Sequence, residues 1–353
     1  MSLDHRSHRA ARIAGGTITA SALLVFAAAC RDSGIKPNGS ESAATVAQQP
    51  VAVQPTAEVV RPESGSVIPE NVTYAEAESS FATKDYATAT EMFDVYTRSH
   101  EKNPWGFYML GMSAWRSGQL DRAKAAFDDA LTLDPGHVKS LVNAGRVMLE
   151  SDQAAAAEEY LAKAIDLDPA SVDAYRVMGR TQALLGNVED ALDAYRTALA
   201  IDPEDTWSMN NMGLVLIQHG RFDEALRPLA RAVQLSEGVA VFENNLGIAL
   251  ERTGHYGAAA EAYRAALTAD SGYTRAAASL ARVDGRNDEP GIDPVTVAEL
   301  GDEFARDVSG WAEQRVSQIA PPTVESDSVP AAVNPADSSG RITAVSQTDS
   351  TSY

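Results

Sequence analysis

Residues 207–226, "WSMNNMGLVLIQHGRFDEAL", and residues 241–260, "VFENNLGIALERTGHYGAAA", have the same residue types at the same positions, 34 residues apart. Each stretch has a pair of asparagines, a glycine two residues later and an alanine twelve residues after the glycine. Asn lowers helix stability by roughly 0.5 kcal/mol per residue, so a repeated pair needs a physical reason. That reason depends on the unit that recurs every 34 residues.

The 34-residue period extends well beyond these two stretches. Two positions define it: Ala89, Ala123, Ala157, Ala191, Ala225 and Ala259, and Gly111, Gly145, Gly179, Gly213 and Gly247. A large apolar residue follows each alanine by four positions: Phe93, Phe127, Leu161, Tyr195, Leu229 and Tyr263. A small residue follows three positions later, except in the first unit, which has Tyr96. A fixed period of this length predicts a stack of identical supersecondary units.

Each unit has the pattern of a helical hairpin. We expect the repeated Gly and Ala to meet where the two helices approach most closely, and the large residue to pack against the next unit. Prolines end the second helices, because Pro cannot continue a helix: Pro135, Pro169 and Pro203. Glycines supply the turn within the hairpin: Gly118, Gly186, Gly220 and Gly254. Pro228, inside a second helix, predicts a local bend.

This pattern resembles the tetratricopeptide repeat (TPR), which implies an all-α, right-handed solenoid of helical hairpins. Six repeats are expected over residues 70–273, with a capping helix over 274–285. They begin near Glu70, Pro104, Val138, Val172, Thr206 and Ala240. The first repeat departs from the pattern, because Ala77 stands where the others have glycine.

In the TPR family, the first helices line a concave groove that holds an extended peptide. By repeat position, the groove residues here are Asn143, Asn210, Asn211, Asn244, Asn245, Lys139, Arg146, Arg176, Arg180 and Trp207, with Trp105 and Trp115 near one end. An amide offers both a donor and an acceptor to a peptide backbone; the alternative interpretation is that the asparagines bond to the neighbouring hairpin. Basic residues in the middle favour an acidic or carboxylate-bearing segment.

The N-terminal region has the layout of an export signal. Arg6, Arg9 and Arg12 precede an apolar run over residues 17–29, and Cys30 follows directly. The sequence "AAAC" at 27–30 resembles a bacterial lipoprotein signal, which implies cleavage after residue 29 and lipidation of Cys30. The protein is then expected to be exported and anchored to the cell envelope, with the periplasmic side of the outer membrane favoured. Residues 30–69 lack any period and predict a disordered spacer.

The C-terminal region contains one more helical pattern, within residues 286–320. Apolar residues recur every three or four positions: Val297, Leu300, Phe304, Val308 and Trp311. Gly301 and Gly310 weaken this helix, so we expect it to dock on the solenoid with Phe304 and Trp311 as anchors. It would extend the cap or, less favoured, fill the groove. Residues 321–353 predict a disordered tail.

Composition and motifs exclude several function classes. The net charge of −20 disfavours nucleic acid as a partner. No phosphate-binding loop, zinc-protease motif or nucleophile elbow occurs, and no cofactor, metal or small-molecule substrate is expected. The sequence therefore predicts a non-catalytic scaffold or adaptor that binds a protein or peptide in the envelope. The alternative is an oligomerising accessory subunit of an envelope assembly, similar to pilus or secretion pilotins, that uses its outer surface.

Overall fold

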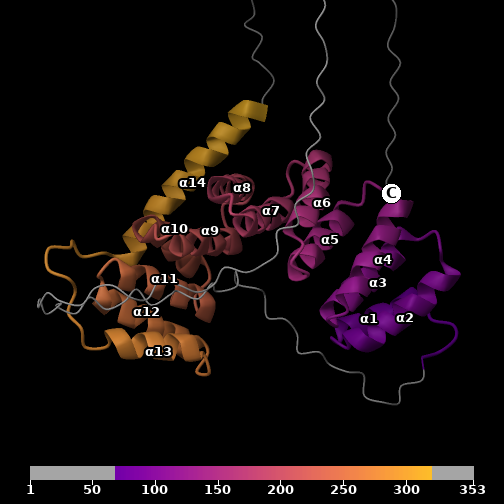
Figure 1. Ribbon diagram of the computed structural model, residues 1–353, viewed down its shortest axis with the longest axis horizontal. Coiled ribbons are helices and arrows are strands. Elements are labelled where there is room, and N and C mark those ends of the chain that lie inside the picture. The colour runs from indigo at the N-terminus through magenta and orange to yellow at the C-terminus, as the bar shows by residue number, and fades with distance from the viewer. Residues whose placement is uncertain (1–67, 320–353) are drawn as a thin grey trace, which may run out of the picture. The chain divides into compact units, whose positions relative to one another are not determined.

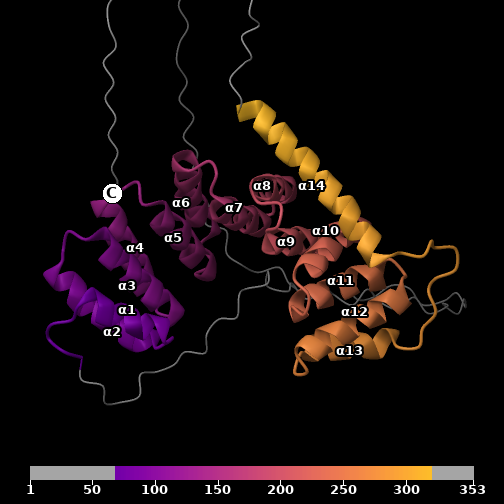
Figure 2. The same cartoon turned by 180° about the vertical axis from the view of Figure 1, so that it is seen from behind.

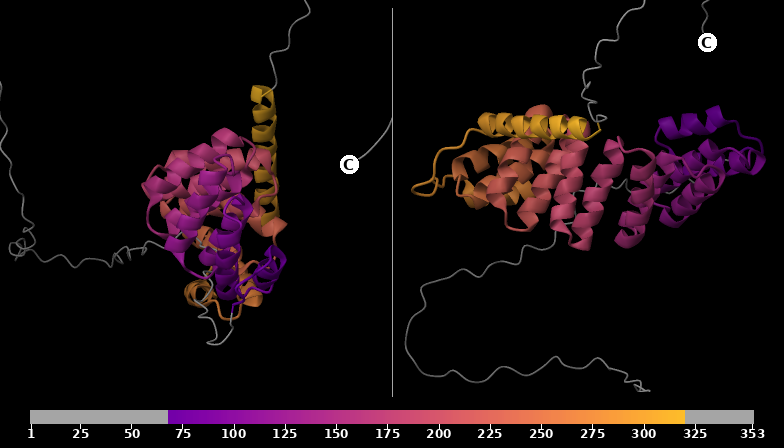
Figure 3. Two further views of the ribbon diagram at one scale, coloured as in Figure 1. Left: turned by 90° about the vertical axis from the view of Figure 1, so that its right-hand side faces the viewer. Right: turned by 90° about the horizontal axis from the view of Figure 1, so that it is seen from above.

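The computed structural model describes residues 68–319, and every regular element in that range is an α-helix. Fourteen helices follow one another in this part of the chain, and neighbouring hairpins lie side by side in chain order (Figure 1, Figure 3). The predicted signal peptide, Cys30, most of the spacer and the tail lie outside the described residues. The all-α fold of stacked hairpins is confirmed.

Six helical hairpins make up the stack. The first helices are α1 (Tyr74–Ala82), α3 (Pro104–Arg116), α5 (Val138–Glu150), α7 (Val172–Leu185), α9 (Thr206–Gln218) and α11 (Ala240–Arg252). The second helices are α2 (Tyr86–Ser99), α4 (Leu120–Leu133), α6 (Ala154–Leu167), α8 (Val188–Ile201), α10 (Phe222–Leu235) and α12 (Tyr256–Ala269). Each helix packs on its hairpin partner and on the following hairpin.

The repeated glycine lies against the large residue of its own hairpin. A Cβ atom on Gly179 would lie 2.5 Å from Cε1 of Tyr195, and one on Gly213 would lie 2.4 Å from Cγ of Leu229. The same contact recurs in the other hairpins that carry this glycine, always with the large residue sixteen positions later. The atoms nearest to the repeated glycine therefore belong to the large residue of the same hairpin, which was expected to pack against the next unit.

The turn inside each hairpin has a residue in the left-handed region. Gly118, Gly186, Gly220 and Gly254 have φ between 73° and 87°, as expected for glycine in a helix-ending turn. The first and third hairpins place Lys84 (φ 65°) and Asp152 (φ 57°) at the same repeat position. A side chain in this conformation costs roughly 1–2 kcal/mol, so these two turns are strained relative to the glycine turns.

Four of the six second helices end at an aspartate that closes a short turn. Asp134, Asp168 and Asp202 each accept, through Oδ1, a backbone N–H two residues later at 3.0 Å. A proline stands between donor and acceptor in these three turns. Asp270 makes the same contact with Gly272 at 2.9 Å, although Ser271 replaces the proline. The aspartate therefore closes the turn with or without proline, and α10 continues through Pro228.

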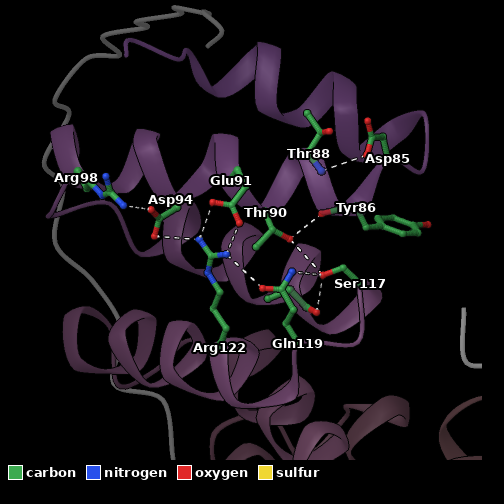
Figure 4. A network of polar contacts seen from close by, with 11 residues as sticks. Asp85, Tyr86, Thr88, Thr90, Glu91, Asp94, Arg98, Ser117, Gln119 and Arg122 are labelled. Atoms are coloured by element: carbon green, nitrogen blue, oxygen red, sulfur yellow. Dashed lines mark hydrogen bonds and ion pairs between the residues drawn. The ribbon is translucent and has the colours of Figure 1, made fainter. Parts of the chain in front are cut away.

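A polar network joins the first two hairpins (Figure 4). Arg122 on α4 contacts Oε1 of Glu91 at 2.5 Å and Oδ1 of Asp94 at 3.3 Å, both on α2. Thr90 and Ser117 lie 3.5 Å apart, hydroxyl to hydroxyl, beside these ion pairs. The degenerate first repeat is therefore held to the second by polar contacts as well as by its apolar core.

The end of the stack is covered by α13 (Thr274–Val283), which packs on α12 and α11. The segment after α13 then lies over the turn of the sixth hairpin. Its Glu289 N–H donates to Gly254 O at 3.1 Å, and the Tyr256 hydroxyl donates to Oε1 of Glu289 at 2.8 Å. These contacts fix the direction in which the chain leaves the cap.

The last helix, α14 (Val297–Ile319), docks on the second helices α10 and α8 (Figure 1, Figure 2). Phe304 and Val308 are 3% and 1% exposed, and Trp311 is half-buried with its ring 5.6 Å from that of Phe304. Docking through Phe304 and Trp311 is confirmed. Both expected positions were wrong, because α14 neither packs on α13 nor lies against the first helices.

Two leucines on the second helices explain where α14 docks. Leu192 on α8 and Leu226 on α10 are 1% and 5% exposed and belong to the same apolar cluster as Phe304. The second and third hairpins have Lys124 and Glu158 at this repeat position, both partly exposed. Burying a leucine side chain stabilises by about 1.5–3 kcal/mol. The fourth and fifth hairpins are therefore the ones with an apolar surface for α14.

Candidate binding surface

Three of the arginines predicted to line the groove lie close together on neighbouring first helices. Arg176 and Arg180 are one turn apart on α7, and Arg146 on α5 has the repeat position that Arg180 has on α7. Burial lowers the pKa of both Arg146 and Arg180, and the positive charge of Arg176 lowers each further. Like charges are therefore held together at this place. We call these three residues the arginine cluster.

Two aspartates compensate part of this charge. Asp173 accepts from Nη2 of Arg146 at 2.9 Å and also pairs with Arg176. Asp205 pairs with Nη1 of Arg176 at 2.6 Å, and its side chain is only 5% exposed. These pairs connect α5, α7 and the start of α9, so the cluster spans three repeats. A partly buried ion pair of this kind fixes geometry more than it adds stability.

Arg180 is the member of the cluster without a carboxylate in ion-pair distance among residues 68–319. Its Nε is buried and has no hydrogen-bond partner within the described part of the chain. The hydroxyl of Tyr195, beneath it on α8, is also buried without such a partner, and burial raises the pKa of Tyr195 while Arg180 lowers it. Glu150 acts on the Arg180 guanidinium through its charge and raises its pKa, but the Nε of Arg180 and the Tyr195 hydroxyl both lack a hydrogen bond among the described residues. Unsatisfied hydrogen-bonding groups beside a guanidinium favour an anionic ligand.

Asn143 holds one member of the arginine cluster, Arg146, in position. Its amide nitrogen donates to Lys139 O at 2.9 Å, and its carbonyl oxygen accepts from Nη1 of Arg146 at 3.0 Å. The side chain is buried, with the residue 5% exposed. Asn143 therefore supports Arg146 in the structure, and direct contact of this residue with a peptide stays a prediction.

Aromatic residues adjoin the cluster on the side of the second repeat. Trp105 is 45% exposed, and Nζ of Lys139 lies 5.2 Å from the centre of its ring. Trp115 donates from Nε1 to Oε2 of Glu150 at 2.9 Å, and the guanidinium of Arg116 lies 5.0 Å from the Trp115 ring. Lys139 and Trp105 are thus the exposed members of the predicted set at this end.

The four paired asparagines lie between the fifth and sixth hairpins and bond to one another. Asn245 donates to Oδ1 of Asn210 at 2.9 Å, which links α11 to α9. Within each pair the contacts are longer, 3.4 Å from Asn210 to Asn211 and 3.5 Å from Asn244 to Asn245. All four residues are at most 4% exposed. The inter-hairpin bond that the sequence left open is therefore present, and it explains the repeated Asn pairs.

Trp207 is placed differently from the other predicted groove residues. It is half-buried and packs edge-on against Phe242, with ring centres 5.0 Å apart. It belongs to the edge of the apolar core of the fourth to sixth hairpins. The predicted set therefore divides into an arginine cluster with neighbouring aromatics, and a buried group of Asn210, Asn211, Asn244, Asn245 and Trp207.

Sequence reasoning missed the residues that complete the site. Asp173 and Asp205 were not singled out, although Asp173 shares the repeat position of Lys139 and of Trp105 and Trp207. Tyr195 was read only as a core residue, yet its hydroxyl lies in electrostatic contact with Arg180. An aligned list of the repeats would have placed Asp173 on the same face as the arginines. Nothing in the sequence marks the unpaired Tyr195 hydroxyl.

The described residues provide no sign of a metal centre or a membrane span. Within residues 68–319, no group of three or more His, Cys, Asp or Glu side chains is arranged to hold a metal ion. Across the same residues, no helix combines the length and the apolar character needed to cross a bilayer.

Family comparisons agree with the hairpin geometry. The model of the middle TPR-like domain of cilia and flagella-associated protein 70 matches residues 75–186. Two tetratricopeptide-repeat models match residues 172–205 and 210–274. The hairpins are tetratricopeptide repeats. TPR proteins generally mediate protein–protein interactions, and a TPR scaffold is typically non-catalytic. No curated protein matches the chain.

Solved structures with the TPR fold are similar to this chain. The Cut9–Hcn1 hetero-tetramer of the APC/C aligns with a TM-score of 0.52 at 16% identity, over 68% of this chain and 48% of that chain. A TPR protein from Parabacteroides merdae gives 0.50 at 15% identity, over 59% and 81%. YrrB, a TPR protein with an unusual peptide-binding site, gives 0.42 at 22% identity, over 54% and 98%. At these identities the first two comparisons show the TPR fold alone.

Proposed function

We propose that this protein is a non-catalytic interaction scaffold that binds an acidic protein segment at the arginine cluster. The observation that carries the proposal is Arg180, which forms no ion pair among the described residues and whose buried Nε, like the buried Tyr195 hydroxyl, has no hydrogen-bond partner there. A carboxylate would accept from the guanidinium and gain the attraction of Arg146 and Arg176. Lys139 and the exposed ring of Trp105 extend the surface toward the second repeat.

The chain's own charge makes this surface selective. With a net charge of −20, most of the protein repels an acidic partner at low ionic strength. A local group of guanidinium side chains is then the place at which such a partner is attracted rather than repelled. The proposed ligand is therefore a segment with at least one Asp or Glu, and its other residues extend along the first helices.

We further propose that the scaffold works in the bacterial cell envelope, with a lipid anchor at Cys30. The supporting observations are the arginines before the apolar run over residues 17–29 and the small residues directly before the cysteine. Two or more acyl chains give durable attachment, whereas one chain binds a membrane only marginally. The partner would accordingly be an exported protein, and the favoured location is the periplasmic side of an outer membrane.

The binding proposal is tested with a pair of arginine variants. In the full chain carrying Cys30→Ser, the affinity for a labelled Glu-rich peptide is measured with wild-type Arg180 and with Arg180→Gln. We expect Arg180→Gln to weaken binding by about 1.5–3 kcal/mol, the range for a hydrogen bond to a charged group. The matched control is Arg196→Gln, because Arg196 on α8 has a 40% exposed side chain and is paired with Asp193 on the same helix.

Three outcomes decide the proposal. Loss of affinity in Arg180→Gln but not in Arg196→Gln supports it. An equal loss in both variants means that only net charge matters, and an unchanged affinity in Arg180→Gln means that the peptide binds elsewhere. Either of these two results overturns the assignment of the arginine cluster as the site. Raising the salt concentration should weaken the wild-type complex, because the surface pairs are screened.

A further inference from the structure

The docked α14 helix returns the chain to the arginine cluster. It starts beside the fifth hairpin, where Gln234 donates to Ala298 O at 2.9 Å, and it passes over α10 and α8. Near its other end, the Arg315 guanidinium donates to Pro169 O and lies 5.8 Å from the centre of the Tyr175 ring. Tyr175 directly precedes Arg176 of the cluster. Arg315, four residues before the end of α14, therefore lies next to the helix that carries Arg176 and Arg180.

The first part of that following sequence is acidic. Residues 320–340 read "APPTVESDSVPAAVNPADSSG", with Glu325, Asp327 and Asp337 and no lysine or arginine. On a chain with a net charge of −20, such a segment is repelled by most of the protein. The arginine cluster is a nearby place that attracts it, since it holds three guanidinium groups and Arg180 forms no ion pair among the described residues.

The segment after α14 is long enough to reach the arginine cluster. Glu325 and Asp327 follow Arg315 by 10 and 12 residues, which span at most about 33–43 Å when extended. Arg176 follows Tyr175 directly, and Arg180 lies one turn further, about 6 Å along α7. A segment tethered over so short a length has an effective concentration on the order of millimolar, so a contact whose dissociation constant lies well below that value is formed most of the time.

We propose that the segment around Glu325 and Asp327 occupies the arginine cluster of its own chain, and that an acidic partner must displace it. This inference rests on the proposed function, because the tail segment and the acidic partner would bind the same arginine cluster. Each carboxylate would accept from an arginine, and Arg180 would receive the acceptor that it lacks. Occupancy within one chain is favoured over a second copy, because the tether supplies proximity and two acidic chains repel one another.

The first test compares two charge-matched pairs of tail substitutions in the full chain carrying Cys30→Ser. Glu325→Gln with Asp327→Asn removes two charges near α14, and Asp337→Asn with Asp349→Asn removes two charges farther along the same tail. We expect the near pair to tighten binding of the labelled Glu-rich peptide about tenfold. The far pair should change it less than twofold, and equal effects of the two pairs overturn the proposal.

The second test reports tail position without any added peptide. Spin labels are attached in the Cys30→Ser chain at Ser326→Cys and Leu184→Cys; Leu184 is 52% exposed and lies one turn after Arg180. We expect a short, narrow distance distribution that broadens with Arg180→Gln and stays unchanged with Arg196→Gln. A broad distance distribution, or one that Arg180→Gln leaves unchanged, overturns the tail proposal even if the peptide binds. A narrow distance distribution in a protein that does not bind the Glu-rich peptide supports the tail proposal and overturns the proposal that an acidic partner binds this site.

Discussion

Asn210 and Asn245 show how a single polar side chain can hold neighbouring hairpins together. Both are buried, and the hydrogen bond of 2.9 Å between them satisfies the Asn245 amide and the Asn210 carbonyl oxygen in an apolar setting. A buried polar group without a partner costs about 1–3 kcal/mol, more than the bond itself contributes. The pair therefore specifies the contact between the fifth and sixth repeats, although asparagine stabilises the two helices less than alanine would.

Asn245→Ala tests this role. Alanine is the better helix former, yet we expect the free energy of unfolding to fall by about 1–3 kcal/mol, because Asn210 loses its partner in a buried site. Urea denaturation followed by circular dichroism measures the change. Asn287→Ala is the control, since Asn287 is exposed in the segment between α13 and α14. An Asn245→Ala chain as stable as the wild type would contradict the inter-hairpin role.

The hairpin turn offers a second substitution whose effect follows from backbone geometry. Lys84 has φ 65° at the position where four other hairpins have glycine. Lys84→Gly should raise the free energy of unfolding by about 0.5–1 kcal/mol, because glycine adopts this conformation without strain but has a more disordered unfolded state.

The reverse substitution is the control for the turn. Gly186 has φ 84°, and no atom lies within 4 Å of the position of an added Cβ, so Gly186→Ala changes only the backbone preference. It should lower stability by about 1 kcal/mol. If both substitutions shift the melting temperature in the same direction, the left-handed conformation is not the cause.

Helices contribute to this fold through the surfaces that they present to helices elsewhere in the chain. The second helices α8 and α10 carry Leu192 and Leu226 where α4 and α6 carry Lys124 and Glu158, and α14 covers the two leucines. Gly301 allows the close approach, because a Cβ there would lie 2.1 Å from Oε1 of Gln234. The same glycine that weakens α14 as an isolated helix thus serves its docking.

Phe304→Ala tests whether α14 depends on this contact. A buried Phe→Ala substitution typically costs about 3–5 kcal/mol, so we expect α14 to undock and its amides to exchange with solvent much faster. The amides of α3 to α6 should exchange at the wild-type rate. Val316→Ala on the same helix is the control, because Val316 is 68% exposed. Equal protection of α14 in both variants would contradict docking through Phe304.

The period and its residue types were sufficient to predict the hairpins, because glycine, alanine and large apolar residues have strict packing requirements in each unit. The position of α14 was not predicted, since the two leucines that decide it look like ordinary apolar variation within a repeat. The arginine cluster followed from repeat positions. The acceptor bonds of Asp173 and Asp205, and the missing partner of Tyr195, depend on side-chain geometry between repeats, which the period does not encode.

At the scale of the whole chain, the proposed role of the solenoid is contact with another protein, and the location of the chain would decide which proteins it meets. The apolar run and Cys30 predict a lipid anchor, and the first described residue is Ile68. The net charge of −20 also keeps the protein away from anionic headgroups. The anchor and the arginine cluster would therefore act on different partners, the membrane and an acidic protein segment.

Cys30→Ser tests the anchor in cells. The wild-type protein should incorporate a labelled fatty acid and fractionate with membranes, whereas Cys30→Ser should incorporate none, because the chain has no other cysteine. Density-gradient separation then identifies the membrane. A wild-type protein without label would remove the lipoprotein proposal while leaving the binding proposal intact.

The contacts of α14 also give the two ends of the solenoid different mechanical properties. A repeat array behaves as a row of units coupled only to nearest neighbours, so it frays from its ends. Here α14 ties α10 and α8 together, and Arg315 extends the tie to Pro169 at the end of the third repeat. The third to fifth repeats are thereby braced by a helix from outside the repeat array, whereas the first two are coupled only to their nearest neighbours. Under a pulling force, the N-terminal repeats should yield first, and they would then be the compliant element between the proposed anchor and the proposed binding surface.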